Sequence, residues 1–353
     1  MPFGIFKSVT FIPSRNQRHH GRAFGQGNPI SIPMKTRDEI IHMTRTKIRL
    51  RHFAYSTEQS YCGWIARYYD FCLRLSRLLA PEKKAEAFLS NLAVRQRVSA
   101  RTQNQALSAV LFLYKEVLVR PLGDIDALRA RQPQHERTAP SRDQVRALRQ
   151  KVEDRPGVPA RLLVDLLYGC GLRVSEPLEL RIKDVLWSEK QLVVRAGKGA
   201  KDRRVPLPSQ CVEPLRHQFD RARQLWEADR KLTRVGVTLP FQLAKKYPSA
   251  AYSWQWFWVF PAVGHCTDPR TGEVVRYHLL HDQIQRAVRE AAKKLGLDGF
   301  ITPHVLRHTY ATHSREQIEA LRQLMGHVSI ETTAGYRHPM VEQASNPLDD
   351  LLQ

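Results

Sequence analysis

The sequence is poor in cysteine and contains no long apolar run. Its five cysteines among 353 residues are odd in number, and no two of them have metal-ligand spacing, which argues against a disulfide framework. No apolar stretch approaches the roughly 18 residues that a membrane-spanning helix requires, and the start lacks the apolar core of a secretory signal. We therefore expect a protein of the reducing cytoplasm that is neither exported nor inserted into a membrane.

Acidic residues are also scarce relative to basic ones. The chain has 34 Asp and Glu against 56 Lys and Arg, which leaves a formal charge of +22. So large an excess attracts polyanions, and nucleic acid is the first partner to consider. The alternative is that the charge serves solubility or contact with an anionic membrane surface.

The N-terminal part of the chain contains a breaker-rich leader, a helical region and a linker. Residues 1–33 hold Gly, Pro and scattered Arg without a sustained period, which predicts a disordered leader or a start codon assigned too far upstream. Residues 34–125 are helical in pattern, with Ser56 and Gln59 spaced as a capping box and Ser99 opening another helix. Residues 126–140 include two prolines and have no period, as an interdomain linker does.

Residues 141–353 combine further helices with a short β segment. Ser141 and Gln144 again form a capping-box pattern. Apolar residues alternate on both sides of the glycine-bearing turn AGKGAKDR within residues 191–208, which predicts two paired strands. Lys198 and Lys201 lie near the tip of that turn. The expected fold is mainly α with a small antiparallel β-sheet.

Three motifs stand out: GCGLRVSE at 169–176, HVLRHTYATH at 304–313 and LMGHVSIETTAGY at 324–336. Each alone is weak, because Arg after a glycine turn is commonly a surface residue, and His or Tyr on a helix commonly packs in a core. Together they resemble the tyrosine recombinases and phage-type integrases. The resemblance implies a helical core-binding (SAM-like) DNA-binding domain over 34–125 and a catalytic domain over 141–353. The family's catalytic pattern maps onto Arg173, Lys198, His304, Arg307, His327 and Tyr336.

The chemistry explains why such residue types are required. A phosphodiester gains negative charge on its non-bridging oxygens in the transition state, and two planar guanidiniums, Arg173 and Arg307, can stabilise that charge. Tyr336 would attack phosphorus and form a covalent phosphotyrosine. Lys198 would protonate the leaving hydroxyl, with Lys201 as the rival for that role or as a phosphate-positioning residue. No metal or cofactor is needed for this scheme.

The remaining catalytic positions have supporting roles in the same scheme. His304 and His327 would position the phosphate and transfer protons. Glu176 occupies a position that is commonly acidic in the family, and we expect it to support the site without taking part in the chemistry.

The stretch between the hairpin and His304 is long and aromatic, and it resembles the insertion of integron integrases, at about 240–280. The similarity lies in KYP at 246–248, the Trp-rich run into residues 259–261, TDPR at 267–270 and the basic segment 276–278, and it extends to TEQSY at 57–61. Aromatic faces beside basic residues suit unstacked bases. We expect DNA contacts from Lys201, Arg203, Trp256, Arg276 and His278. The alternative is that two or three of Trp254, Trp256, Phe257 and Trp258 simply pack in a core.

The resemblance thus implies a site-specific recombinase that integrates or excises gene cassettes at attI and attC sites. Its partners would be double-stranded attI-like DNA, folded single-stranded attC-like hairpins and three further copies of itself in a tetramer on DNA. It would act in the bacterial cytoplasm, at the nucleoid. A relaxing topoisomerase of related mechanism is an alternative that the integron-like insertion argues against.

Several features depart from the family pattern. Only twenty positions separate Arg307 from His327, Pro177 would interrupt a helix outside its first turn, and Tyr277 stands where many relatives have His. They leave open a relative that binds DNA without cutting it. A zinc site built on His304, His308 and His313 is a further alternative, although the glutamate of an HExxH motif is missing.

Overall fold

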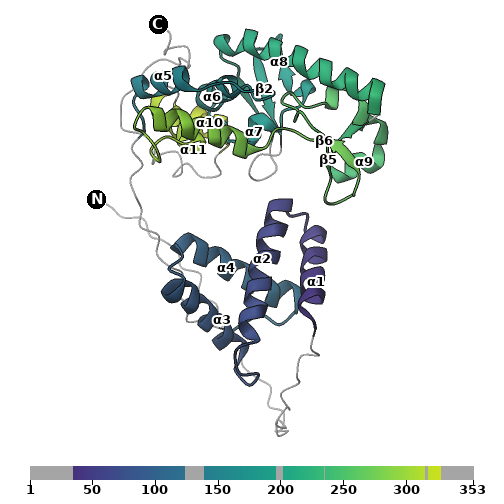
Figure 1. Ribbon diagram of the computed structural model, residues 1–353, viewed down its shortest axis with the longest axis vertical. Coiled ribbons are helices and arrows are strands. Elements are labelled where there is room, and N and C mark those ends of the chain that lie inside the picture. The colour runs from purple at the N-terminus through teal and green to yellow at the C-terminus, as the bar shows by residue number, and fades with distance from the viewer. Residues whose placement is uncertain (1–34, 124–138, 196–201, 234, 315–316, 327–353) are drawn as a thin grey trace, which may run out of the picture. The chain divides into compact units, whose positions relative to one another are not determined.

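The computed structural model describes residues 35–123, 139–195, 202–233, 235–314 and 317–326. The chain divides into two compact units, with the division after His135 (Figure 1). The leader expected at 1–33 and most of the linker expected at 126–140 lie outside the described residues.

The N-terminal unit is entirely helical in its described part. A capping box between Thr36 and Glu39, which was not predicted, starts its first helix. The predicted cap at Ser99 is confirmed, because its side chain caps the fourth helix. The predicted capping box at Ser56 is wrong, because the second helix already begins at Tyr55 and places Ser56 inside its first turn. The elements are α1 (Arg37–Leu50), α2 (Tyr55–Cys72), α3 (Pro81–Ser90), the π-helical turn η1 (Asn91–Arg95), α4 (Ala100–Phe112) and the π-helical turn η2 (Leu113–Val117).

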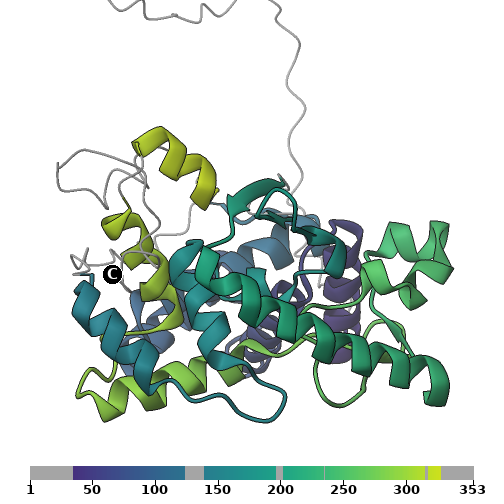
Figure 2. The same cartoon turned by 90° about the horizontal axis from the view of Figure 1, so that it is seen from above.

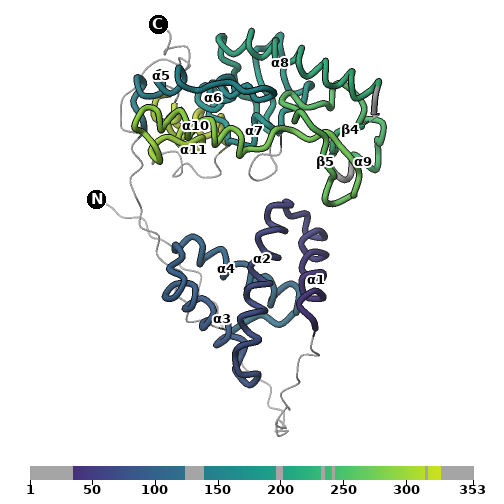
Figure 3. Tube along the Cα trace, in the orientation of Figure 1, coloured from purple at the N-terminus to yellow at the C-terminus, as the bar shows by residue number. Residues whose placement is uncertain are grey.

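The core of this unit forms where α2, α3 and α4 pack together (Figure 3). Phe88 and Tyr68 meet edge to face with ring centroids 5.3 Å apart, and Leu107 and Val110 of α4 are buried. A buried carboxylate beside this core, that of Glu58, accepts two hydrogen bonds of 2.9 Å from Arg49. The buried negative charge of Glu58 is therefore paired with a guanidinium, which offsets the cost of removing it from water.

The C-terminal unit surrounds one nearly all-buried helix, α6. Every residue of α6 except Arg161 is buried, because α5, α8, α10 and α11 cover it. Figure 2 shows the longest of these, α8, crossing the unit. The predicted capping box of Ser141 and Gln144 is confirmed at the start of α5. The helices are α5 (Arg142–Lys151), α6 (Ala160–Gly169), α7 (Ser175–Leu178), α8 (Ser209–Ala228), α9 (Phe241–Lys246), α10 (His281–Lys294), α11 (Pro303–His313) and α12 (Ile318–Met325).

Two small sheets complete this unit. The first is antiparallel, in the order β1-β2-β3, and pairs Leu192 with Val205 as two buried residues. It confirms the predicted fold class, mainly α with a small antiparallel sheet. The second, in the order β4-β6-β5, lies within and beside the expected insertion and was not predicted. The strands are β1 (Val185–Leu186), β2 (Gln191–Val194), β3 (Arg203–Pro206), β4 (Gly236–Val237), β5 (Cys266–Thr267) and β6 (Val274–Arg276).

The structure contains no candidate membrane span among the helices described above, since none is both long and apolar enough to cross a bilayer.

Candidate catalytic site

A glycine turn after α6 sets the position of Arg173. Gly171 has a φ of +60°, and a Cβ at this position would lie 2.3 Å from Cδ1 of Tyr310 on α11. Only glycine allows this close approach between the turn and α11. The carbonyl oxygen of Gly171 then accepts a 2.6 Å hydrogen bond from Nη1 of Arg307, so the turn that leads into Arg173 also binds the second arginine of the expected clamp.

The proline after Glu176 does not disturb this arrangement. Pro177 is the third residue of the short helix α7, within its first turn, where no intrahelical partner exists for a backbone N–H. Pro177, which departs from the family pattern, is therefore compatible with the local helix.

Glu176 connects three guanidinium groups. Its carboxylate accepts hydrogen bonds of 3.0 and 2.6 Å from Nη1 and Nη2 of Arg203, and one of 2.7 Å from Nη1 of Arg173. Nη1 of Arg307 lies 3.8 Å from the same carboxylate. Three positive charges surround one negative charge, which leaves a local excess suited to an anion.

The protonation state of Glu176 follows from these neighbours. Burial alone would raise the pKa of its carboxyl group, but the hydrogen bonds and charges of Arg203 and Arg173 outweigh burial and hold that pKa below its usual value. Glu176 is therefore ionised at neutral pH.

The same three arginines hold the C-terminal end of α12. Nε of Arg203 donates to the carbonyl of Leu324 at 2.7 Å, Nη2 of Arg307 to Met325 at 2.5 Å, and Nη2 of Arg173 to Gly326 at 3.4 Å. The last carbonyls of a helix lack intrahelical donors and carry the negative end of its dipole. The guanidinium groups supply both hydrogen-bond donors and positive charge to these carbonyls.

Solvent exposure separates the members of this cluster. The side chain of Arg173 is 29% exposed, whereas those of Arg307 and Arg203 are 4% and 9% exposed. Arg173 is thus the most accessible of the three guanidiniums. His304, on the exposed side of α11, lines a pocket of about 300 Å³ together with Val174, the neighbour of Arg173.

Four of the expected catalytic or DNA-contacting residues, Lys198, Lys201, His327 and Tyr336, lie outside the described residues. Their roles stay predictions. Lys198 and Lys201 fall between β2 and β3 in the chain, and His327 follows Gly326 directly.

Two arginines expected to contact DNA have side chains directed into the protein. Arg203 belongs to the Glu176 cluster described above. Arg276, on β6, is buried and donates to both carboxylate oxygens of Asp229 at 2.5 and 2.6 Å and to the carbonyls of Ala262 and Val263 at 2.7 Å. The expected DNA contact of both arginines stays a prediction, although these donors are engaged within the protein.

The aromatic segment is divided between core and surface. Phe257 and Trp258 are buried, while Trp254 and Trp256 are half-buried, so the packing alternative holds for two of the four. Trp256 has the Nζ of Lys183 2.9 Å from its ring centroid. It lines a pocket of about 290 Å³ that extends to Glu176 and His278.

His278 is a buried neutral imidazole. Burial lowers its pKa to about 4, while its Nδ1 lies 2.7 Å from the carbonyl oxygen of Leu279. Its ring centroid is 4.0 Å from that of Tyr277 and 4.9 Å from that of Trp258. His278 is 7% exposed and lines the same pocket as Trp256.

The alternative zinc site finds no support in this geometry. Nδ1 of His313 lies 2.9 Å from the hydroxyl of Tyr168, and within the described ranges no three His, Cys, Asp or Glu residues lie close enough to hold a metal ion together.

The family models cover both units. Residues 141–343 match the model of the phage integrase family, and residues 40–124 match the phage integrase N-terminal SAM-like domain. The chain belongs to the phage integrase family. It is an enzyme of the tyrosine recombinase type.

Among curated relatives, an integrase/recombinase of Escherichia coli is 38% identical and covers 89% of this chain and 94% of its own length. The tyrosine recombinase XerD of Agrobacterium fabrum is 31% identical over 86% of this chain and 89% of its own length.

Solved integrase structures share the fold. The Tn1549 transposon integrase in complex with circular intermediate DNA has a TM-score of 0.56 at 14% identity, covering 88% of this chain and 97% of that one. A lambda integrase dimer bound to a core site has a TM-score of 0.56 at 17% identity, covering 85% and 95%.

Sequence reasoning missed two parts of this integrase site. The sequence did not predict that Arg203, on β3, bonds the carboxylate of Glu176 in the GCGLRVSE motif. The hydrogen bonds to the backbone carbonyls at the end of α12 could not be predicted, because no side-chain pattern marks them. The glycine of LMGH marks only where that helix ends.

We predict that Glu176→Gln destabilises the C-terminal unit by about 3–5 kcal/mol at pH 7, because it leaves clustered and partly buried guanidiniums without their carboxylate. Urea denaturation of both proteins measures the difference. Since the folded pKa of Glu176 is lowered, its stabilising contribution is present above pH 4.5 and is lost as pH falls below that value, so the two proteins should converge in acid.

The control for this prediction is Glu189→Gln. Glu189 forms an exposed ion pair with Arg204, and its loss should cost less than about 1 kcal/mol. Equal destabilisation of the two variants would contradict the central role of Glu176.

We also predict that Arg276→Ala lowers the unfolding free energy by about 3 kcal/mol, because Asp229 loses its bidentate partner in the interior. The exposed Arg270→Ala variant is the control, with an expected change within about 0.5 kcal/mol. Chemical denaturation measures both. A fully stable Arg276→Ala protein with weakened DNA affinity would restore the surface role that the structure argues against.

Proposed function

We propose that this protein is a site-specific DNA recombinase that cleaves and rejoins DNA through a 3′-phosphotyrosine intermediate on Tyr336. The observation that carries the proposal is the gathering of Arg173 and Arg307 around Glu176, from segments more than a hundred residues apart. The cluster keeps a positive excess after its one carboxylate is counted. It therefore suits a single phosphate.

The proposed chemistry assigns one task to each group. Arg173 and Arg307 bind the non-bridging oxygens and stabilise the charge that develops there. The phenolic oxygen of Tyr336 attacks phosphorus, the bond to the 5′ oxygen breaks, and Lys198 donates a proton to that oxygen. His304 and His327 accept and return protons at the phosphate. A 5′ hydroxyl of a partner strand reverses the step and joins new strands.

The short segment before His327 is compatible with an active site. Although only twenty positions separate Arg307 from His327, α12 occupies residues 318–325 of this interval, and the carbonyls of Met325 and Gly326 at its end hydrogen-bond to Arg307 and Arg173. This supports the catalytic reading over that of a relative which binds DNA and no longer cleaves it.

We further propose that the substrates are the attI and attC sites of integrons, recombined by a tetramer on DNA. The support is the segment 240–280 and the pocket lined by Trp256 and His278, which adjoins the Glu176 cluster. A base that protrudes from a folded attC hairpin could enter this pocket beside Trp256. Stacking of this kind is worth roughly 1–3 kcal/mol per base.

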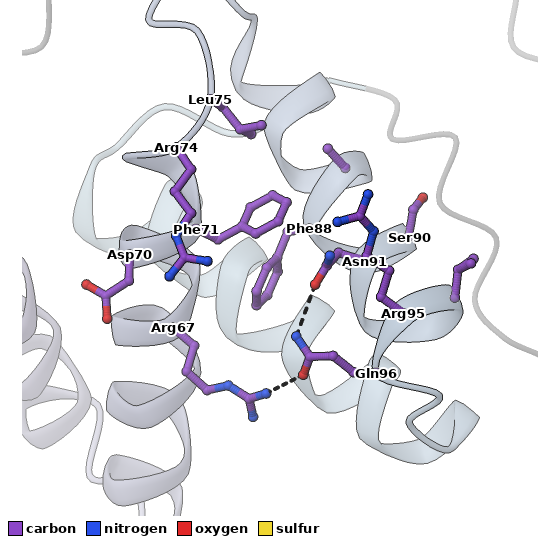
Figure 4. A pocket seen from close by; sticks show the side chains of 12 residues that line it. Arg67, Asp70, Phe71, Arg74, Leu75, Phe88, Ser90, Asn91, Arg95 and Gln96 are labelled. Carbon is purple, nitrogen blue, oxygen red and sulfur yellow. Dashed lines mark hydrogen bonds between the residues drawn. The ribbon is translucent and has the colours of Figure 1, made fainter.

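The N-terminal unit offers a second DNA contact in a basic groove of about 750 Å³. Figure 4 shows Arg67 of α2 and Arg74, in the turn after α2, on one side, Arg95 of η1 on the other, and the rings of Phe71 and Phe88 between them. Arg67 hydrogen-bonds to Gln96. Within the part of the chain that the structure describes, the side chains of Arg74 and Arg95 have no bonded partner, and we assign them to the phosphate backbone.

The test of the nucleophile is Tyr336→Phe, because removal of the phenolic oxygen leaves nothing to bond to phosphorus. We expect no covalent adduct on a nicked attC substrate and no cassette excision in cells, with DNA affinity unchanged within about twofold. The control is Tyr247→Phe at an exposed tyrosine of the insertion, which should keep adduct formation. An adduct that persists in Tyr336→Phe would defeat the assignment.

The test of the groove is the double substitution Arg74→Gln and Arg95→Gln. Loss of two phosphate contacts should reduce the slope of log K against log salt by about two, because fewer counterions are released on binding. Fluorescence anisotropy with a labelled duplex over a salt series measures the slope.

Its matched control removes two exposed charges outside the groove, in Lys115→Gln and Arg120→Gln. An equal reduction of the slope by both pairs would show that the groove has no special role.

A further inference from the structure

Arg203 differs from the two other arginines of the cluster in its bonding. It alone donates both Nη groups to Glu176 and, in addition, its Nε to the end of α12, at the carbonyl of Leu324. Three of the five N–H groups of its guanidinium are thus directed into the protein. With 9% of its side chain exposed, little of Arg203 is left for a DNA phosphate.

The backbone around α12 is shaped for this contact. Gly326 ends the helix in the left-handed conformation, with a φ of +62°. A Cβ at Gly326 would lie 3.3 Å from Cδ and 3.4 Å from Nη1 of Arg203, closer than ordinary van der Waals contact. The glycine therefore serves both the turn and the close approach of Arg203.

Arg203 also lies on a rigid support. It belongs to β3 and pairs with Val194 of β2 in the antiparallel sheet. Through its side chain it joins this sheet to α7, which carries Glu176, and to α12. Glu176 in turn bonds the side chain and the backbone N–H of Arg173, at 2.7 Å each.

We propose that Arg203 is a positioning residue of the recombination site, which orients Arg173 through Glu176 and fixes the end of α12, the helix that leads into His327. The inference rests on the proposed function, which it deepens. The planar fork of arginine is required, because a lysine ammonium cannot bond two carboxylate oxygens and a carbonyl from fixed directions.

The first experiment needs no DNA. Hydrogen exchange followed by mass spectrometry compares the full-length protein with Arg203→Ala, Arg203→Lys and the control Arg204→Ala. Arg204 is the next residue on β3 and pairs with the exposed Glu189. We expect amides of 318–326 to exchange at least about tenfold faster in both Arg203 variants, with α6 unchanged. Unchanged exchange at α12 would overturn the proposal.

A second pair of variants covers the case in which Arg203→Ala loosens the whole unit. Gly326→Ala and Gly296→Ala both place alanine at a positive φ, but only the first presses on Arg203, since Gly296 has open space around its missing Cβ. Because alanine at this positive φ strains the end of α12 by itself, the readout is exchange at β3 and α7, which Arg203 joins. Faster exchange there in Gly326→Ala and not in Gly296→Ala supports the proposal. Equal behaviour of the two variants contradicts it.

The second experiment separates positioning from DNA contact. On the nicked attC substrate at saturating concentration, Arg203→Ala should form the covalent adduct about 100-fold more slowly, with its dissociation constant and salt slope unchanged, and Arg203→Lys should not restore the rate. Weakened binding, a salt slope reduced by about one and rescue by lysine would mean a phosphate contact and would overturn the proposal.

The two experiments fail in different ways. If the unaltered protein forms no adduct on attC DNA, the proposed function fails, while the exchange measurements still decide whether Arg203 holds α12.

Discussion

The carboxylate of Glu176 is the constraint on which the rest of this structure depends. Three guanidiniums would repel one another in the half-buried space between α7, α11 and β3, and a single ionised carboxylate allows them to gather. The carbonyls at the end of α12 satisfy donors that the carboxylate does not reach. Each of the three guanidiniums thus has internal partners, yet the cluster keeps an excess of positive charge for a phosphate.

The fold brings the members of this cluster together from distant parts of the chain. Arg173 follows the buried helix α6, Arg203 lies on the small sheet, and Arg307 lies on α11, which packs against α6. The contact of Gly171 with Tyr310 sets the spacing between the first and the third. Stability and catalysis are therefore coupled here, because the same ion pairs that hold the elements together orient the groups that would bind the phosphate.

Much of the architecture could be predicted from local sequence patterns. Ion pairs between residues far apart in the chain could not be predicted in this way. The capping box at Ser141 and the paired strands follow from neighbouring residues. Arg276 looks like a surface residue beside aromatics, because its partner Asp229 is 47 positions earlier in the chain. The pairing of Arg203 with Glu176, 27 positions earlier, was missed for the same reason. The catalytic motifs themselves came from resemblance, and the structure adds how Arg173 and Arg307 are held.

A structure of this protein bound to its DNA site would test the account most directly. The account predicts one backbone phosphate whose non-bridging oxygens lie within hydrogen-bond distance of both Arg173 and Arg307, with the Tyr336 oxygen in line with the bond that breaks. Arg173 and Arg307 on different phosphates, or a scissile phosphate that neither touches, would contradict it.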